Sequence, residues 1–383
     1  MNSFRRVVVA AAVLLLGTLP AAFAFAGTRD IWTKVPDNAN SGQILTGLIC
    51  YSPTNCVATS GVKDDVYLSN DGGRTWSVSH SLENLANQHG LTCIANGTCF
   101  QLAYLEDTAT TPIKYIGVAI TKSTDGGSHW SEVYSSRVSP ETGIAPSYVL
   151  SSVSCPSNSE CVVVGHNGNA SFRLSTSNGG HSWTKSKIFG APFVAIACPT
   201  TIVCYGVKGQ RDVPVYKSTD SGLTWTTMPA PINYFFNKND GPVLGFALGS
   251  IACYSDTWCA VGGYQNTHYG NSYGFSPVIW GMANGSTWLY GGSVNISAFS
   301  PTKSIVGGGI SCPSFGHCVA ETTYGTIVDV TYLKRSLKVS RDIDSPATNS
   351  VSYLFSCRTH SWCVSVAVNE KNITEFRLMQ IGL

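Results

Sequence analysis

Short apolar runs alternate with turns rich in glycine and polar residues along the whole chain, and no segment shows a sustained helical periodicity. One pattern recurs seven times: a small residue, an apolar residue, a variable and often small residue, and then a cysteine. A second cysteine follows six residues later, and a run of β-forming residues such as Val162-Val163-Val164 comes after it. Each repeat therefore predicts one strand that ends at the first cysteine, a five-residue turn, and an antiparallel strand that begins at the second.

The cysteines predict one disulfide in each of these strand pairs. All 14 cysteines fall into pairs at the same spacing: Cys50/Cys56, Cys93/Cys99, Cys155/Cys161, Cys198/Cys204, Cys253/Cys259, Cys312/Cys318 and Cys357/Cys363. Opposite residues of an antiparallel pair lie close enough for a disulfide. In an exported chain this pattern indicates a disulfide framework, whereas in a cytosolic enzyme it would favour metal. We therefore expect seven disulfides and no metal site.

A second motif follows the cysteine pair in the first four repeats. Its copies are Ser69-Asn70-Asp71-Gly72-Gly73-Arg74-Thr75-Trp76, Ser123-Thr124-Asp125-Gly126-Gly127-Ser128-His129-Trp130, Thr176-Ser177-Asn178-Gly179-Gly180-His181-Ser182-Trp183 and Ser218-Thr219-Asp220-Ser221-Gly222-Leu223-Thr224-Trp225. A fifth copy, at 281–288, keeps only Gly285, Thr287 and Trp288. This motif resembles the Asp-box, or bacterial neuraminidase repeat, Ser/Thr-x-Asp-x-Gly-x-Thr-Trp. We call the motif the box, and its third and eighth residues the box aspartate and the box tryptophan.

The residue types of the motif predict a structural role. An aspartate can accept hydrogen bonds from the backbone N–H groups of a turn, a glycine can take positive φ, and a tryptophan can fill the space between neighbouring sheets. Families that carry the Asp-box place it in a turn remote from the active centre. We therefore expect structural roles, and no catalysis, for Asp71, Trp76, Asp125, Trp130, Asn178, Trp183, Asp220 and Trp225.

Each repeat thus predicts four antiparallel strands, A to D, which is the content of one propeller blade. First cysteines of successive repeats lie 43, 62, 43, 55, 59 and 45 residues apart, within the range of propeller repeats. The chain ends after strand C of the seventh repeat, and Ile31-Trp32-Thr33-Lys34 resembles the segment Trp183-Thr184-Lys185 that begins a strand D. The predicted fold is an all-β, seven-bladed propeller whose N-terminal strand closes the last blade. Because the sixth repeat lacks the box, six blades plus a separate hairpin remains an alternative.

The first 26 residues have the features of a secretory signal peptide. Arg5 and Arg6 precede an apolar run that ends at Pro20, and the small-residue cleavage sites at 22–26 follow. We expect a signal peptide at 1–26, a propeller domain at 27–383, no integral membrane segment after cleavage, and a periplasmic or extracellular location. Without Arg5 and Arg6 the 24 basic residues become 22, equal to the 22 acidic residues, and this neutrality argues against nucleic acid as a partner.

The longest insertions in the repeats predict where a ligand binds. In a blade of alternating strands the A–B and C–D turns share one face, and the B–C and D–A connections share the opposite face, which we call the loop face. The insertions fall on the loop face, and they carry the candidate ligand-binding residues Tyr234, Phe235, Phe236, Tyr264, His268, Tyr269 and Tyr273. Aromatic rings suit a sugar or the apolar side chains of a protein. The alternative is that these rings only pack the insertions onto the blades.

The resemblance to Asp-box proteins implies catalysis only if active-site residues are also present. Sialidases of this type have six blades, an Arg-Ile-Pro motif and an arginine triad, and no Arg-Ile-Pro occurs here. The alternative function is a secreted glycoside hydrolase, which needs two carboxylates about 5 to 9.5 Å apart. Loop-face candidates for such roles are Arg137, Arg211, Arg341, Asp64, Asp65, Glu106, Asp107, Glu141, Asp212 and Asp240.

The same repeats also resemble seven-bladed propellers related to photosystem assembly factors, which act by binding proteins. The number of blades favours this resemblance over the sialidases. We therefore expect an exported, monomeric, non-catalytic propeller without a cofactor, which binds a protein or carbohydrate ligand through its loop face.

Overall fold

The computed structural model describes residues 31–34, 44–61, 65–80, 82–107, 109, 114–137, 148–168, 170–210, 215–231, 243–269, 272–293, 309–322, 327–333, 336–343, 351–359, 361–368 and 374–380. The signal peptide predicted at 1–26 lies outside the described residues and stays a prediction. Within these ranges the regular secondary structure consists of strands, and no helix there is long and apolar enough to cross a membrane.

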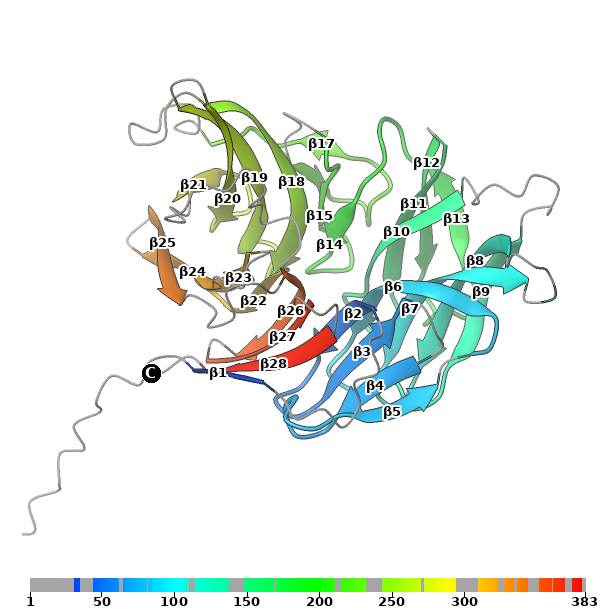
Figure 1. Ribbon diagram of the computed structural model, residues 1–383. Coiled ribbons are helices and arrows are strands. Elements are labelled where there is room, and N and C mark those ends of the chain that lie inside the picture. Colours follow the sequence, from blue (N-terminus) through cyan, green and yellow to red (C-terminus); the bar gives the residue numbers. More distant parts are fainter. Residues whose placement is uncertain are drawn as a thin grey trace, which may run out of the picture.

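The strands form seven four-stranded antiparallel sheets arranged in a ring (Figure 1). Blade 1 contains β2 (Leu45–Cys50), β3 (Cys56–Ser60), β4 (Asp65–Ser69) and β5 (Ser77–His80); blade 2 contains β6 (Leu85–Cys93), β7 (Cys99–Asp107), β8 (Lys114–Ser123) and β9 (Ser131–Arg137). Blade 3 contains β10 (Tyr148–Ser154), β11 (Cys161–Asn167), β12 (Ala170–Thr176) and β13 (Thr184–Lys187); blade 4 contains β14 (Ala195–Ala197), β15 (Cys204–Val207), β16 (Tyr216–Ser218) and β17 (Thr226–Thr227).

Blades 5 and 6 complete the regular repeats, and blade 7 takes strands from both ends of the chain. Blade 5 contains β18 (Val243–Cys253), β19 (Cys259–Tyr269), β20 (Ser272–Met282) and β21 (Trp288–Ser293); blade 6 contains β22 (Ile310–Ser314), β23 (His317–Glu321), β24 (Ile327–Leu333) and β25 (Ser336–Ile343). Blade 7 contains β26 (Val351–Thr359), β27 (Trp362–Val368), β28 (Thr374–Gln380) and β1 (Ile31–Lys34). The predicted seven-bladed propeller is confirmed, and the alternative of six blades plus a hairpin is wrong.

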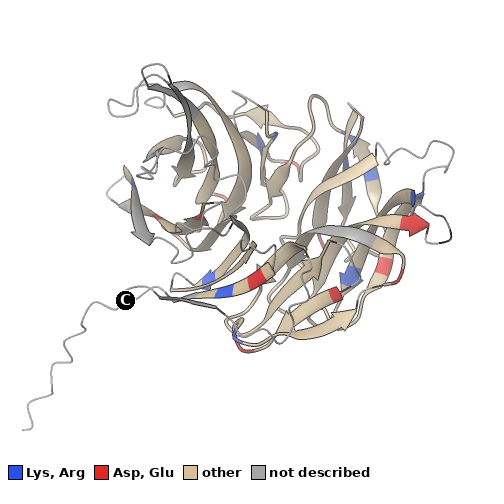
Figure 2. Ribbon diagram, viewed as in Figure 1, with Lys and Arg blue, Asp and Glu red and all other residues tan. Residues whose placement is uncertain are grey.

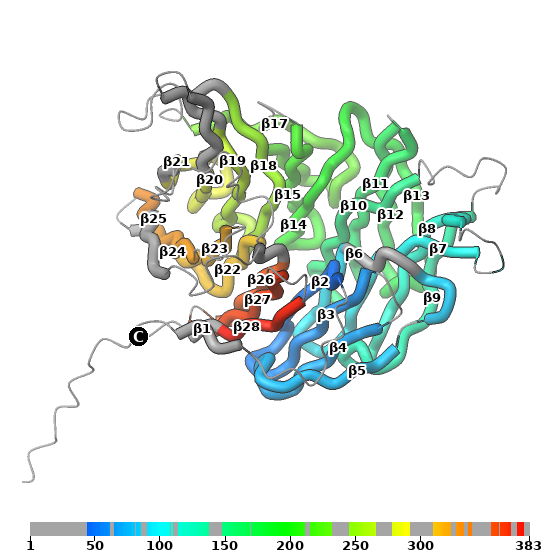
Figure 3. Tube along the Cα trace, in the orientation of Figure 1, coloured from blue at the N-terminus to red at the C-terminus, as the bar shows by residue number. Residues whose placement is uncertain are grey.

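The A strands of neighbouring blades contact one another all the way round the ring. Contacts join β2 to β6, β6 to β10, β10 to β14, β14 to β18, β18 to β22, β22 to β26 and β26 to β2. The tube in Figure 3 follows the chain through these seven sheets in sequence order. Because the strands of each blade alternate in direction, the strand ends joined by the A–B and C–D turns lie on one face of the ring, which we call the box face. The strand ends joined by the B–C and D–A connections lie on the opposite face, the loop face.

The N-terminal strand closes blade 7 in the register of the other blades. Strand β1 pairs with β28, with Trp32 opposite Met379, and Met379 lies opposite Cys363 on β27. In blade 5 the same path across the sheet leads from Cys259 through Met282 to the box tryptophan on β21. Trp32 therefore occupies the register position of a box tryptophan.

Blade 6 closes its C–D turn without a box. Strands β24 and β25 stay paired as far as Leu333 and Ser336, so two residues separate them. Strand pairing up to these two residues thus takes the place of the eight-residue motif of blades 1 to 4. This explains why blade 6 has four strands without a box sequence.

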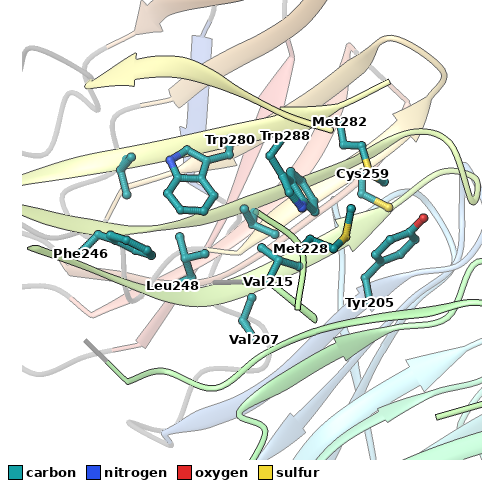
Figure 4. Close-up of a cluster of buried hydrophobic side chains, with 12 residues drawn as sticks. Tyr205, Val207, Val215, Met228, Phe246, Leu248, Cys259, Trp280, Met282 and Trp288 are labelled. Atoms are coloured by element: carbon teal, nitrogen blue, oxygen red, sulfur yellow. The ribbon is translucent and has the colours of Figure 1, made fainter. Parts of the chain in front are cut away.

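The core consists of apolar side chains packed between neighbouring blades. Figure 4 shows the cluster between blades 4 and 5, where Tyr205 and Val207 face Phe246, Trp280 and Trp288. Each of these five side chains is at most 3% exposed. A single four-stranded sheet cannot bury both of its faces alone, so each blade depends on its neighbours for burial.

All seven predicted disulfides are confirmed. Each joins the two cysteines of one repeat, with Cα atoms 4.0 to 4.1 Å apart, and no free cysteine is present among the described residues. In the loop-entropy model a ring of this size contributes about 2 kcal/mol.

The strand boundary predicted at Cys318 is wrong, although its disulfide with Cys312 forms as predicted. Strand β22 continues past Cys312 to Ser314, and β23 begins at His317, so Cys318 lies inside a strand. Ser314 pairs directly with His317, and the register of this strand pair shifts between Ser311 and Ser314. Pairing across the turn thus extends the sheet beyond the disulfide, and the five-residue turn predicted for this repeat becomes a tight hairpin.

Blade 7 departs from the predicted boundary in the same direction. Strand β26 continues past Cys357 to Thr359, and β27 begins at Trp362, one residue before Cys363. Thr359 pairs with Trp362. In both blades the strand pairing therefore encloses the disulfide instead of ending at it.

We predict that β1 stabilises the whole ring. A mature chain that begins at Val35 lacks the four residue pairs between β1 and β28, which leaves β28 as an open edge. At about 1 kcal/mol for each lost hydrogen bond, unfolding free energy should fall by roughly 2 to 4 kcal/mol and Tm by about 5 °C or more. Thermal denaturation of this chain against one that begins at Gly27 measures the effect, and equal Tm values would contradict it.

We predict no free thiol in the protein produced in an oxidising compartment. Alkylation of the denatured, unreduced protein should add no mass, and alkylation after reduction should add 14 adducts. Intact mass spectrometry provides the measurement. Any adduct on the unreduced protein would show that a pair had not formed.

Candidate functional site

The box turns of blades 1 to 4 share one hydrogen-bond pattern. In blade 1 the Asp71 Oδ1 accepts from the Ser69 hydroxyl and from the N–H groups of Arg74 and Thr75, each at 2.9 Å. The Thr75 hydroxyl donates to Asp71 Oδ2 at 2.6 Å. Equivalent bonds surround Asp125, Asn178 and Asp220. These side chains are thus occupied in holding their own turns.

The C–D turn of blade 5 has the same hydrogen bonds from backbone N–H groups to a side-chain oxygen, but the turn is one residue shorter. Met282 lies opposite the second cysteine, Cys259, which is the register of the first box residue in the other blades. Asn284 therefore has the position of the box aspartate, and its Oδ1 accepts from the N–H groups of Ser286 (3.0 Å) and Thr287 (2.8 Å). Sequence comparison missed Asn284 because alignment on the tryptophan places it one position too late.

Each box tryptophan packs toward the preceding blade. Trp76 stacks on Phe376 of blade 7 with ring centroids 4.1 Å apart, and Trp288 meets Tyr205 of blade 4 edge to face. The Trp76 Nε1 donates to the carbonyl of Gly73 in its own turn at 3.0 Å. The turn therefore sets the direction of the ring that enters the neighbouring blade.

A second contact between blades involves residues that sequence reasoning missed. In four of the box turns, the backbone carbonyl of the residue that follows the box aspartate or asparagine accepts a hydrogen bond. The donor is a side chain of the preceding blade. The pairs are Trp362 Nε1 to Gly72 O (2.8 Å), Lys122 Nζ to Gly179 O, Arg173 Nε to Ser221 O and Lys217 Nζ to Gly285 O (each 2.7 Å). Lys122 and Lys217 directly precede the first residue of a box in the sequence. This shared position is the sequence signal that would have identified them as donors to the next blade.

The predicted loop-face aromatic residues lie partly in strands. Tyr234, Phe235 and Phe236 lie outside the described residues. Tyr264 is half-buried on β19, opposite Ala247 and Pro277, and His268 pairs with Tyr273 across β19 and β20. The insertion that carries Tyr264, His268, Tyr269 and Tyr273 was expected as a connection between strands, but β19 and β20 stay paired through it as far as Tyr269 and Ser272. Its alternating aromatic and polar residues favour continued strand pairing.

The predicted catalytic carboxylates show no common pocket where the structure describes them. Asp65 Oδ1 lies 3.2 Å from His80 Nδ1, at the start of blade 1 strand C. Glu106 and Asp107 are consecutive on β7, so their side chains face opposite sides of the sheet. The other candidates, Asp64, Glu141, Asp212 and Asp240, lie outside the described residues, as does Arg211. Arg137 and Arg341 lie on different blades, at β9 and β25.

The strongest described feature of the loop face is an exposed aromatic residue between β13 and β14. Phe189 is 83% exposed, whereas Ile188 and Phe193 beside it are 3% and 1% exposed. The Ile188 N–H donates to the carbonyl of Ser171 (3.0 Å), and the Ser171 hydroxyl donates to the carbonyl of Gly190 (2.9 Å). Phe189 is therefore presented to solvent from a backbone that is fixed on both sides.

A largely buried lysine lies beside this connection. Lys208 is 8% exposed, and its Nζ lies 4.2 Å from the ring centroid of Tyr216 and 4.8 Å from that of Phe193. Burial lowers the pKa of Lys208, and no carboxylate pairs with it among the residues that the structure describes. Cation–π contacts hold the ammonium in place without neutralising its charge.

Val194 and Lys187 lie beside these residues. We call Phe189, Lys208, Val194 and Lys187 together the loop-face patch. Val194 is 43% exposed, and its N–H donates to the Val207 carbonyl at 2.9 Å. Lys187 Nζ lies 5.2 Å from the Phe189 ring centroid. Two exposed apolar side chains thus stand beside two cations. Figure 2 shows charged residues of both signs scattered over the blades.

No group of three or more His, Cys, Asp or Glu side chains that could hold a metal ion occurs within the described ranges. The loop-face patch therefore offers a surface for contact, made from apolar area and positive charge.

We predict an acid-dependent contribution of the box turns to stability. Burial raises the pKa of the Asp125 carboxyl, but hydrogen bonds from His129 and Ser123 outweigh burial and lower this pKa from 3.8 to about 2. Hydrogen bonds lower the pKa of Asp71 and Asp220 in the same way. Because the folded-state pKa is depressed, the stabilisation is present above about pH 4 and is lost as the pH falls toward 2.

The test replaces each box aspartate by asparagine, the residue that blade 3 already has at this position as Asn178. Thermal denaturation between pH 5 and 2 should show a smaller fall in Tm for the triple variant D71N/D125N/D220N than for the unsubstituted protein. The amide keeps an oxygen acceptor for the turn but does not titrate. Parallel Tm profiles for the two proteins would contradict the assignment.

No protein-family model and no curated protein sequence matches the chain. Solved structures do match. The chain is similar to YCF48 bound to a D1 peptide (TM-score 0.54, 11% identity, 93% of this chain and 97% of that one) and to YCF48 from Cyanidioschyzon merolae (0.53, 13%, 91% and 98%). It is also similar to part of an ancestral GH74 enzyme (0.52, 12%, 89% and 46%).

At identities of 11 to 13% this likeness shows the fold alone. The similar proteins differ in function, since one is bound to a peptide and another is an enzyme. The chain is a disulfide-bonded, seven-bladed β-propeller, similar in architecture to YCF48 and to a propeller part of a GH74 enzyme.

Proposed function

We propose that this chain is an exported, monomeric, non-catalytic propeller that binds a protein partner through its loop face. The observation that carries the proposal is Phe189, which is 83% exposed on a fixed backbone segment. An aromatic side chain presented in this way costs little entropy when it enters a pocket of a partner. Aromatic residues are enriched in protein interfaces relative to the rest of a protein surface.

The chemistry of the loop-face patch indicates the kind of protein segment that it would bind. Phe189 and Val194 favour an apolar side chain of the partner, and Lys187 and Lys208 favour an acidic one. A carboxylate near Lys208 would provide the charge partner that this largely buried lysine lacks among the described residues. The expected ligand is therefore a segment of a protein with an apolar residue close to an acidic one.

One of the similar structures supports a binding role. A YCF48 propeller is bound to a D1 peptide in one of the similar structures, so this architecture can accept a peptide. The GH74 likeness keeps a glycoside hydrolase as the second candidate function. The described carboxylates favour the hydrolase less, because Glu106 and Asp107 face opposite sides of β7.

Export is the part of the proposal that rests on the sequence and on the disulfides. A chain with seven disulfides and no free cysteine among the described residues suits an oxidising compartment. The signal peptide at 1–26 would deliver it there. N-terminal sequencing of the protein from culture fluid and periplasm tests cleavage and location together, and a mature protein that retains Met1 in the cytoplasm would contradict export.

We predict that binding depends on the loop-face patch. Capture of partners from the native secretome, followed by titration of the captured partner, should be weaker by about 10-fold or more for Phe189→Ser, because truncation of an interface hot spot costs about 2 kcal/mol. Lys208→Met keeps the apolar stem and removes the charge, so it should weaken binding of an acidic segment.

The matched control is Val78→Ser, which removes a 47% exposed apolar side chain from the outer strand of blade 1, away from the patch. Equal losses for Val78→Ser and Phe189→Ser would contradict a specific site. Assays with fluorogenic glycosides test for a hydrolase, and a glycan array tests for a carbohydrate ligand. Turnover that disappears with a loop-face carboxylate variant would replace this proposal by the hydrolase.

A further inference from the structure

A polar cavity lies on the box face between blades 3 and 4, on the opposite side of the ring from the loop-face patch. Its volume is about 140 Å³. The lining includes Glu160 from the A–B turn, Arg173 and Ser175 from β12, Ser182 from the box turn of blade 3, and Ser221 from the box turn of blade 4. Since about 10 to 15 Å³ is enough for one water molecule and drug-sized pockets exceed about 300 Å³, the cavity suits one small ring-sized molecule.

A difference between blades explains why the cavity exists here. Blades 2 and 4 have a lysine directly before the box, Lys122 and Lys217, and each ammonium reaches a carbonyl of the next blade at 2.7 Å. Blade 3 has Ser175 at this position. The carbonyl of the next blade, at Ser221, is instead reached by Arg173 Nε from two residues earlier on β12. The short Ser175 side chain leaves open the space that a lysine fills elsewhere.

The groups around this space include a carboxylate oxygen that lacks a donor. Glu160 Oε2 is buried and has no hydrogen-bond partner in the structure. This oxygen has almost no accessible surface, so a ligand would reach it only after a small rotation of the Glu160 side chain. Because a buried carboxylate oxygen without a donor is unfavourable, a ligand that donates to it after such a rotation would be stabilised. Arg173 uses its Nε for Ser221, and the other guanidinium N–H groups are further donors of the same side chain. Hydroxyl groups such as those of Ser175 and Ser182 both donate and accept.

We propose that this cavity binds a monosaccharide or a sugar unit of similar size. A sugar hydroxyl would donate to the Glu160 carboxylate, a second would accept from the Arg173 guanidinium, and the serine hydroxyls would complete the network. The formal charges of Glu160 and Arg173 cancel, which suits a neutral ligand with many hydroxyl groups. This site is independent of the loop-face patch and of the partner that binds there.

The experiment compares the mature protein with a variant that fills the cavity. Saturation-transfer NMR and calorimetry are carried out with glucose, galactose, mannose and N-acetylglucosamine at millimolar concentration. We expect binding of at least one sugar, and at least a 10-fold loss of affinity for Ser175→Lys. The fold should survive this change because blades 2 and 4 carry lysine at the same position. Glu160→Gln, which keeps the shape but replaces the acceptor oxygen by an amide group, should also weaken binding.

The control is Val78→Ser, which should bind sugar like the unsubstituted protein. Ser175→Lys should leave capture of the loop-face partner unchanged, so the two proposals fail separately. No binding of any sugar in the panel would overturn the proposal, as would sugar binding that Ser175→Lys and Glu160→Gln leave unchanged. Binding of glycine or serine in place of sugars, with the same sensitivity to both variants, would show a site for amino acids and would also overturn it. If Ser175→Lys does not fold, Glu160→Gln alone decides.

Discussion

Packing of each blade against the one before it is the interaction on which the whole structure depends. A twisted four-stranded sheet has two apolar faces, and in this protein neighbouring blades supply the cover for both. The box tryptophans enter this interface, as Trp76 does when it stacks on Phe376 at 4.1 Å. Hydrogen bonds to the box turns then fix the neighbouring blades relative to each other, as between Arg173 Nε and Ser221 O. The box turn therefore serves the ring as much as its own blade.

The interface between blades 6 and 7 departs from this apolar pattern. Glu321 on β23 is fully buried, and its Oε2 accepts from the Ser365 hydroxyl on β27 at 2.7 Å. Arg377 on β28 lies opposite Ser365 and is 4% exposed. Since the bond from Ser365 to Glu321 joins β27 to β23, it gives this interface a directional contact that apolar packing alone does not provide. It lies next to the place where the two ends of the chain meet.

Repeats that are local in sequence made most of the fold predictable. The six-residue cysteine spacing identified strands A and B, and the box identified strands C and D, so the blade count and the closing strand at Ile31–Lys34 followed. Contacts between blades depend on how two sheets far apart in sequence are placed, and Lys122 and Arg173 were missed for this reason. The exposure of Phe189 was also missed, since its neighbours Ile188 and Phe193 have the same apolar character but are buried.

The disulfides have a consequence for the topology of the whole molecule. Each one joins residues six apart in the same blade, so no covalent bond links one blade to another except the chain itself. The ring is therefore closed only by non-covalent contacts, chiefly those of β1 with β28 and of blade 1 with blade 7. It can open at that junction into a string of seven covalently stapled sheets, and it can close again without any exchange of disulfides.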